Sequence, residues 1–254
     1  MEPQDSSVEF VQSQGRKRRM RLRVKFAKYG ALKFIGHLDV MRFFQKANRR
    51  AELDMSYSTG FSPHQIMSFA APLGLGLESN GEYMDIEVNS VTTAPEMIAA
   101  LNEQMVEGIK VLEMKRLPEE AGNAMASVAA AKYSIRFREG YEPTFAYQDV
   151  LQDFYAQKEI VVTKKTKKSE ATFDMKPFIY ELGMDSDGKT ITMTVDASSA
   201  GNIKPNLVMS ALYAYQQAEF DDYALLITRE ETYMNVGEEE HRNLVPLGAI
   251  GEDF

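Results

Sequence analysis

Apolar and polar positions recur in two similar series along this chain. The first series predicts four extended segments and two helices, and the second predicts five extended segments and two helices. In the first series, Leu22, Val24 and Phe26 alternate with basic residues, as in a half-buried strand. Val40 and Phe44 follow at helical spacing. The first series predicts, in order, a strand at residues 20–26, a helix at 37–51, extended segments at 66–70 and 82–88, a helix from the capping-box sequence Thr93-Ala94-Pro95-Glu96, and a strand at 109–115.

The second series repeats this order. The turn sequence Asp187-Gly188 predicts a hairpin just before residues 190–196, where apolar residues alternate with threonines. The second series predicts a strand at 132–137, a helix from Pro143, extended segments at 160–165 and 172–182, a strand at 190–196, a helix from Pro205, and a strand at 225–231.

Both series have the order β-α-β-β-α-β, which is the ferredoxin-like arrangement. The expected fold class is therefore α+β, with two tandem ferredoxin-like units packed into one compact protein; a single continuous α+β domain is the alternative. The expected divisions are a disordered, basic-ended arm at 1–19, a first unit at 20–117, a linker at 118–131, a second unit at 132–236 and an acidic tail at 237–254.

Charge is distributed very unevenly over this pattern. Residues 16–50 contain thirteen Lys or Arg and one acidic residue, Asp39, although the whole chain has a formal net charge of −8. The remaining residues therefore carry about 20 excess negative charges. A dense basic stretch on an acidic protein favours a polyanionic partner.

Cysteine is absent, so the chain forms no disulfide and has no thiolate for catalysis, zinc or an iron–sulfur cluster. With three histidines and no carboxylate loop of metal-binding spacing, we expect no metal site and no bound cofactor. No apolar run reaches the roughly 18 residues of a membrane span, and the first residues lack the pattern of a secretory signal. A cytoplasmic location without a membrane partner is the expectation.

The predicted helix at 37–51 is the first candidate site. Arg42, Lys46 and Arg49 share one of its faces. If Leu22, Val24 and Phe26 face the core, the opposite sheet face carries three further cations, and arm, sheet and helix could form one basic surface. The cations of that face are Arg21, Arg23 and Lys25. The alternative is an ordinary solvated helix face.

The loop that follows is the second candidate, because it combines aromatic, hydroxyl and imidazole groups. Tyr57 and Phe61 could stack on a base, while Gly60 and Pro63 fix the backbone and Ser58 adds a hydroxyl. The alternative is an ordinary loop anchored by a buried Phe.

Two histidines of this region, His37 and His64, are candidates for general acid–base catalysis of metal-free RNA cleavage. The alternative is that a histidine at a helix start caps or packs.

Lysines form a third candidate site in the second half, as a contact for a polyanion or as a solvated hairpin tip. The cluster comprises Lys164, Lys165, Lys167 and Lys168, with Asp174 and Lys176 after it. In the first half, Glu82 and Asp85 follow Ser79, and we expect these carboxylates to pair with the basic helix.

Several of these motifs together resemble the radical-SAM-linked protein family, a bacterial domain of unknown function fused to, or encoded beside, radical SAM proteins. The resemblance lies in RVKFAKYGALKFIGHLDVMRFFQKANRRA, in YSTGFSPHQIMSFAAPLGLGLES, in EYMDIE, and in the second-half lysine cluster with Asp174-Met175-Lys176. The matching positions include His37, Asp39, Arg42, Gly60, Phe61, Pro63, His64, Ser79, Glu82 and Asp85. The resemblance implies a radical SAM partner and work linked to RNA or ribosomes, but no reaction of this chain itself.

Three functions are compatible with these observations. The first is a non-catalytic RNA-binding module that serves a separate radical SAM protein, with tRNA or rRNA as its ligand and no role for DNA. The second is a metal-independent RNA-processing or RNA-modifying enzyme that uses His37 and His64. The third is a protein-interaction partner whose basic face docks an acidic subunit.

Overall fold

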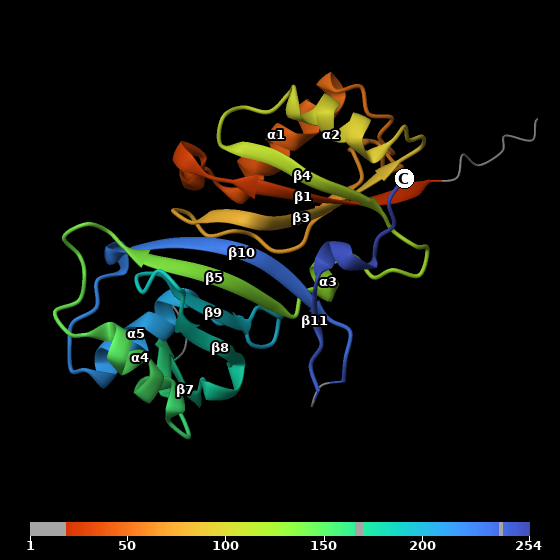
Figure 1. Cartoon of the computed structure of the whole chain (residues 1–254). Helices are drawn as coiled ribbons and strands as arrows, with labels where there is room; N and C mark the ends of the chain where they lie inside the picture. The colour runs from red at the N-terminus through yellow and green to blue at the C-terminus, as the bar shows by residue number, and fades with distance from the viewer. Residues whose placement is uncertain (1–18, 166–169, 239–240) are drawn as a thin grey trace, which may run out of the picture.

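The protein is a mixed α+β structure in which a large mixed sheet carries few helices (Figure 1). A computed structural model describes residues 19–165, 170–238 and 241–254. Its principal sheet has nine strands, in the order β4-β1-β3-β10-β5-β9-β8, with β2 paired to β3 and β11 paired to β10. No helix in the described ranges has the length and apolar character needed to cross a membrane.

The first half of the chain forms one end of this sheet. Its strands are β1 (Met20–Lys28), β2 (Met67–Phe69), β3 (Glu78–Val88) and β4 (Ile109–Arg116), and its helices are α1 (His37–Arg50) and α2 (Ala94–Asn102). All pairings among these four strands are antiparallel. Both helices lie over one face of the strands (Figure 1).

Helix α1 packs on this face through the apolar stripe that its sequence predicts. Val40, Phe44 and Ala47 are buried along it at helical spacing. Phe26 of β1 meets Phe44 edge-to-face with ring centroids 4.8 Å apart, and Phe69 of β2 lies 5.9 Å from Phe26. The alternation of β1 therefore directs its apolar residues toward α1, as expected.

The second half forms the other end of the sheet. Its strands in the sheet are β5 (Ala130–Phe137), β8 (Ile179–Met184), β9 (Ile191–Asp196) and β10 (Leu225–Asn235), and its helices are α4 (Tyr147–Ala156) and α5 (Pro205–Tyr215). A second core lies between these helices and the inward residues of the strands, including Ile135, Leu151, Met193 and Leu212.

The extended region expected at 172–182 is broken in two. Its first part belongs to a separate hairpin of β6 (Val161–Lys165) and β7 (Glu170–Asp174), and its second part is β8. The break follows from Asp174, whose carboxylate accepts hydrogen bonds from the backbone N–H groups of Ile160 and Lys176 at 2.7 and 2.9 Å. Pro177 comes next in a short 3-10 helix and cannot donate to a strand ladder.

The two halves are joined by a short parallel pairing between β3 and β10, in which Glu78 lies opposite Thr228 and Ser79 opposite Arg229. The backbones then approach closely at Gly81, where a Cβ atom would lie 2.5 Å from the Cα of Glu231. Glycine is required there because any side chain would collide with β10.

The segments expected to be a linker and a tail are both part of the folded structure, which corrects those expectations. Helix α3 (Ala124–Ser127) lies within the expected linker, and β5 begins before the linker's expected end. In the expected tail, β11 (Leu244–Pro246) pairs with β10, and the 3-10 helix η4 (Leu247–Ile250) follows. Leu247 is completely buried, and the backbone of Glu252 exchanges two hydrogen bonds with Arg116. Leu247 and Glu252 make their contacts with strands far earlier in the chain, and local periodicity does not report such contacts.

Arg23 and Asp85 form a buried ion pair, and we expect this pair to be needed for the stability of the protein. Replacing Arg23 by Met leaves a buried carboxylate without its cation, so the free energy of unfolding should fall by about 3–5 kcal/mol. Urea denaturation followed by circular dichroism measures this loss. Arg42→Met, which removes the exposed partner of Asp39, is the matched control and should change the free energy of unfolding by less than about 1 kcal/mol. Equal effects of the two variants would show that the buried pair has no special role.

Candidate functional site

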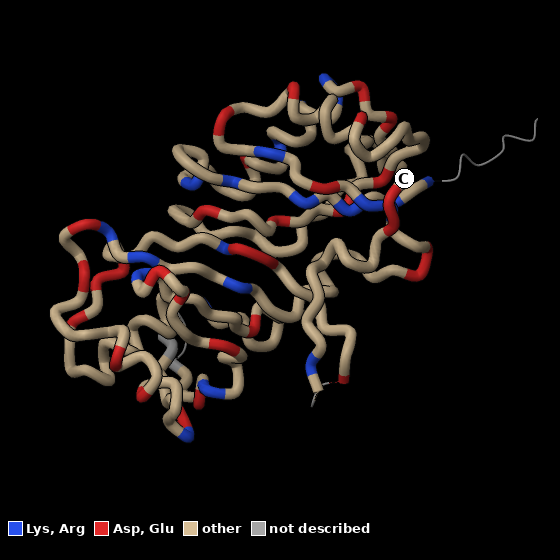
Figure 2. Tube along the Cα trace, viewed as in Figure 1, with Lys and Arg blue, Asp and Glu red and all other residues tan. Residues whose placement is uncertain are grey.

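The sheet face that carries Arg21, Arg23 and Lys25 is not an open basic surface. Arg23 is 1% exposed and binds both carboxylate oxygens of Asp85, at 2.8 and 3.0 Å. Arg21 donates to the carbonyl oxygens of Pro118, Glu119 and Ala121, and Lys25 forms an ion pair with Glu231. Figure 2 shows Lys and Arg positions along β1 close to Asp and Glu positions of neighbouring segments. The expected single surface of arm, sheet and helix is therefore corrected: these strand cations bind groups of the protein itself.

The carboxylates of β3 also pair with strand cations, whereas the sequence led us to expect pairing with α1. Asp85 binds Arg23, and Glu82 lies 2.9 Å from Arg229 of β10. Burial alone would lower the pKa of the Arg229 guanidinium, but the Glu82 carboxylate and the Tyr133 hydroxyl outweigh burial and raise this pKa. Ser79 is buried and donates its hydroxyl to the carbonyl oxygen of Arg229. These residues fasten the two halves together.

Helix α1 does present its basic residues to solvent. Arg42, Lys46 and Arg49 are all exposed on the face opposite the core, and we call them the α1 ridge. Asp39, in the first turn, lies 3.4 Å from Arg42, but both side chains remain about two-thirds exposed. An exposed pair of this kind is weak and is screened by salt. Within the described ranges, no ion pair engages Lys46 or Arg49, so the ridge is free to bind anions.

The loop of residues 57–64 is fastened beside this ridge. Gln65 donates to the backbone carbonyl of Gln45 at 3.0 Å and accepts from the side-chain amide of Asn48 at 3.0 Å, so the loop's end is tied to α1 between Arg42 and Arg49. Asn48 is fully buried. The buried amide pair therefore sets the position of the loop relative to the ridge.

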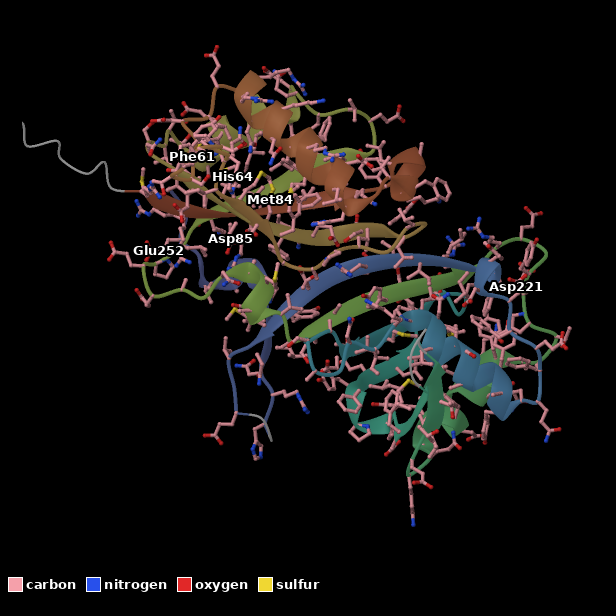
Figure 3. All side chains as sticks on the ribbon, turned by 180° about the vertical axis from the view of Figure 1, so that it is seen from behind. Phe61, His64, Met84, Asp85, Asp221 and Glu252 are labelled. Carbon is pink, nitrogen blue, oxygen red and sulfur yellow. The ribbon has the colours of Figure 1, made fainter. Side chains whose placement is uncertain are left out.

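The loop carries its aromatic ring outward. Phe61 has an exposed fraction of 111%, and Tyr57 at the base of the loop is 42% exposed. Gly60, just before Phe61, has φ = +119°, which an L residue rarely adopts, and Pro63 has no amide hydrogen to donate. Figure 3 shows Phe61 and His64 on the α1 side of the sheet and Asp85 on the other side. The alternative of a buried Phe anchor is therefore wrong.

The two candidate histidines have different surroundings. His64 Nδ1 lies 2.8 Å from Ser58 Oγ, and the backbone N–H of His64 also donates to that hydroxyl, so the pair closes the loop. His37 packs edge-to-face on Phe69, with ring centroids 5.0 Å apart. No hydrogen bond or ring contact among the described residues joins the two imidazoles.

The second-half lysine cluster is only partly within the structure. Lys164 and Lys165 lie on β6, in the hairpin apart from the main sheet, and their side chains are not described. Lys167 and Lys168 lie outside the described residues, as do residues 1–18 of the expected arm. Arg19 is described and lies 3.6 Å from Glu87. Asp174, in the matching motif, positions backbone groups between β7 and β8.

The structure shows two surfaces that the sequence did not predict. Exposed apolar side chains of Phe34, Leu38 and Leu75 lie around the start of α1, where Gly76 donates its backbone N–H to the carbonyl of Lys33. A cavity also lies on the second-half sheet, lined in part by Lys132 and Arg242. Neither has a sequence signal, because each gathers residues from distant segments. No group of three metal-ligating side chains occurs in the part of the chain that the structure describes.

A comparison with known families places this site in context. The sequence profile of the family described as "Uncharacterized protein conserved in bacteria (DUF2344)" matches residues 21–205. The chain belongs to this family. The DUF2344 match includes the α1 ridge, the 57–64 loop and the β6–β7 hairpin, whereas β10, which supplies Arg229, lies beyond it. No curated protein matches the chain.

Proposed function

We propose that this protein binds single-stranded RNA without cleaving it, through the α1 ridge and the 57–64 loop. The observation that carries the proposal is the fully exposed ring of Phe61 on a loop whose end is hydrogen-bonded to α1, the helix that presents three exposed cations. The ring of Phe61 projects from its loop with both faces open, so it can stack on an unpaired base. Cations next to an aromatic platform are the arrangement that single-stranded nucleic acids recognise through phosphates and unstacked bases.

RNA is favoured over duplex DNA by the shape of this surface. A protruding ring stacks on splayed bases, which occur in the loops and ends of tRNA and rRNA. The major groove of duplex DNA is read by a helix or a two-stranded β-ribbon that enters it, and α1 has a core face against the sheet and a loop tied to it. The lysines of the β6–β7 hairpin would add a second contact.

We further assign each half to the ferredoxin-like arrangement, so that the chain contains two such units in tandem. Support comes from the strand orders: β4-β1-β3-β2 in the first half and β10-β5-β9-β8 in the second. RNA-recognition domains with a four-stranded sheet bind bases on the sheet face. Here Leu247 and α3 cover that face of the first half, so the helix and loop side is the surface left for RNA.

The partner that we propose is a radical SAM protein, in the bacterial cytoplasm, with this chain presenting RNA for modification. The resemblance of the α1, loop and β3 motifs to the radical-SAM-linked family supports this pairing. These 254 residues contain no cysteine and cannot ligate a cluster, so the cluster must lie outside them.

Protein docking is the second candidate function, and the apolar side chains at the start of α1 favour it. Phe34, Leu38 and Leu75 are each more than half exposed. Large exposed apolar groups of this kind typically mark a protein interface. The two functions are compatible, because the apolar group lies at the start of α1, whereas the loop is tied to its later part at Gln45 and Asn48. The enzymatic alternative with His37 and His64 has no contact between the imidazoles to support it.

Reversing the charge of the ridge should weaken RNA binding. The double variant Arg42→Glu and Lys46→Glu should lower affinity and reduce the slope of log K against log salt by about 0.7 for each phosphate that is no longer neutralised. Fluorescence anisotropy with a labelled single-stranded RNA, from about 50 to 300 mM salt, measures both. The matched control is Lys110→Glu with Lys158→Glu, two exposed lysines away from the ridge. Equal losses of affinity in both double variants would indicate nonspecific attraction and contradict the proposed site.

Removing the exposed ring of Phe61 should lower RNA affinity without changing the salt dependence of binding. Phe61→Ala should weaken binding by about 5- to 150-fold, the equivalent of about 1–3 kcal/mol for one stacked base. The salt slope should stay unchanged, because every cation that neutralises a phosphate is still present. Phe34→Ala, which removes an exposed ring from the 3-10 helix that precedes α1, should bind RNA normally. A normal affinity in Phe61→Ala would contradict the stacking role of the loop.

The partner is tested by co-purification. The tagged full chain, expressed together with a candidate radical SAM protein, should retain that protein after nuclease treatment. The double variant Phe34→Ser and Leu38→Ser should release it, because the docking surface then has less apolar area. Retention that nuclease abolishes would mean that RNA alone connects the two proteins. In that case direct docking is contradicted.

A further inference from the structure

A cavity of about 720 Å³ lies on the second-half sheet, on the face away from α4 and α5. This volume falls within the range of small-molecule sites. Its lining includes Lys132, Lys176, Tyr180, Glu181, Tyr233 and Arg242. Of the candidate-site residues from the sequence, only Lys176 lines this cavity. The cavity lies on the second half of the protein, whereas the α1 ridge lies on the first.

The floor of the cavity is a row of polar side chains in register across three strands. Lys132 of β5 lies opposite Thr194 of β9, which lies opposite Glu181 of β8. The Thr194 hydroxyl donates to the Glu181 carboxylate at 2.8 Å, so that carboxylate is held in place.

Lys132 has no carboxylate of its own. Its neighbour on β10 is Glu231, but that carboxylate binds Lys25 and the Tyr83 hydroxyl of the first half. No side-chain hydrogen bond or ion pair links Lys132 to another residue of the described ranges. Its ammonium group is therefore available to an anion in the cavity.

The walls supply flat rings and further cations. The Arg242 guanidinium stacks over the Tyr180 ring at 4.6 Å, and the Tyr180 hydroxyl is fixed by donating to Asp196 at 2.7 Å. Lys176 donates to the backbone carbonyl of Tyr155. Tyr233 lines the same cavity from β10, and no hydrogen bond to a described residue occupies its hydroxyl.

Three cations around one carboxylate, on a strongly acidic chain, favour an anionic ligand. Lys132 and Arg242 suit a phosphate, because ammonium and guanidinium groups both bind phosphate oxygens through charge-assisted hydrogen bonds. The Glu181 carboxylate suits the hydroxyls of a ribose, and the tyrosine rings suit a planar base. We propose that this cavity binds a nucleoside monophosphate, either as a free nucleotide or as the phosphorylated end of an RNA.

The proposal does not rest on RNA binding at the α1 ridge. Isothermal titration calorimetry of the full chain with AMP, adenosine and ribose 5-phosphate tests it directly. AMP should bind at least about tenfold more tightly than either fragment, because only AMP uses both cations and rings. Lys132→Met should weaken AMP binding by about tenfold or more, and Lys110→Met, an exposed lysine of β4, is the matched control. Arg242→Met, in an exposed segment, gives the same test if Lys132→Met does not fold.

A second experiment distinguishes a free nucleotide from an RNA end as the ligand. It compares the binding of RNA oligomers that have a 5′-phosphate with that of oligomers that have a 5′-hydroxyl. Tighter binding of the phosphorylated oligomer, abolished in Lys132→Met, supports an RNA end as the ligand; no difference, with AMP still bound, supports the free nucleotide. AMP binding should be normal in the ridge variant Arg42→Glu and Lys46→Glu. No AMP binding at millimolar concentration, or equal binding of AMP and ribose 5-phosphate, would overturn the proposal.

Discussion

The buried ion pair of Arg23 and Asp85 is the constraint on which the arrangement of the first half depends. A guanidinium that is almost completely removed from water must have its donors satisfied, and here they bind the Asp85 carboxylate and the carbonyl oxygens of Gly122 and Leu247. Asp85 in turn accepts from the backbone N–H of Ala124. One buried charge pair therefore fixes two central strands, the segment between the halves and the C-terminal segment.

This closure determines which charges of the basic stretch are available to a partner. Strand cations are bound to carboxylates and carbonyl groups, and they stabilise the fold. Helix α1 turns its basic residues away from that network, because its opposite face packs on Phe26 and Phe69. The surface that we propose for a polyanion is therefore limited to the α1 ridge and the 57–64 loop, whose end the Asn48–Gln65 amide pair ties to α1.

The junction of the halves determines the charge balance of the cavity on the second-half sheet. Glu231 of β10 binds Lys25 and Tyr83 of the first half, and the pKa of Tyr83 is raised by burial and by the Glu231 carboxylate. Because Glu231 is occupied in this way, Lys132 beside it lacks a counter-charge. The same contact that joins the halves thus leaves a cation free in the cavity, and the two proposed sites can be tested independently.

The sequence by itself determined the element order, the apolar face of α1 and the exposed position of its ridge, because these depend on local periodicity. It also indicated the 57–64 loop, through its aromatic, glycine and proline residues. Only the tertiary structure decided that Arg23 is buried, that residues after 237 pack on β1, β4 and β10, and that Asp174 interrupts an extended segment. Those outcomes depend on partners about 60 to 220 residues away in the case of Arg23, or on a side chain bonding to backbone in the case of Asp174. Alternation can place Arg23 on a sheet face, but what covers that face is set by long-range packing.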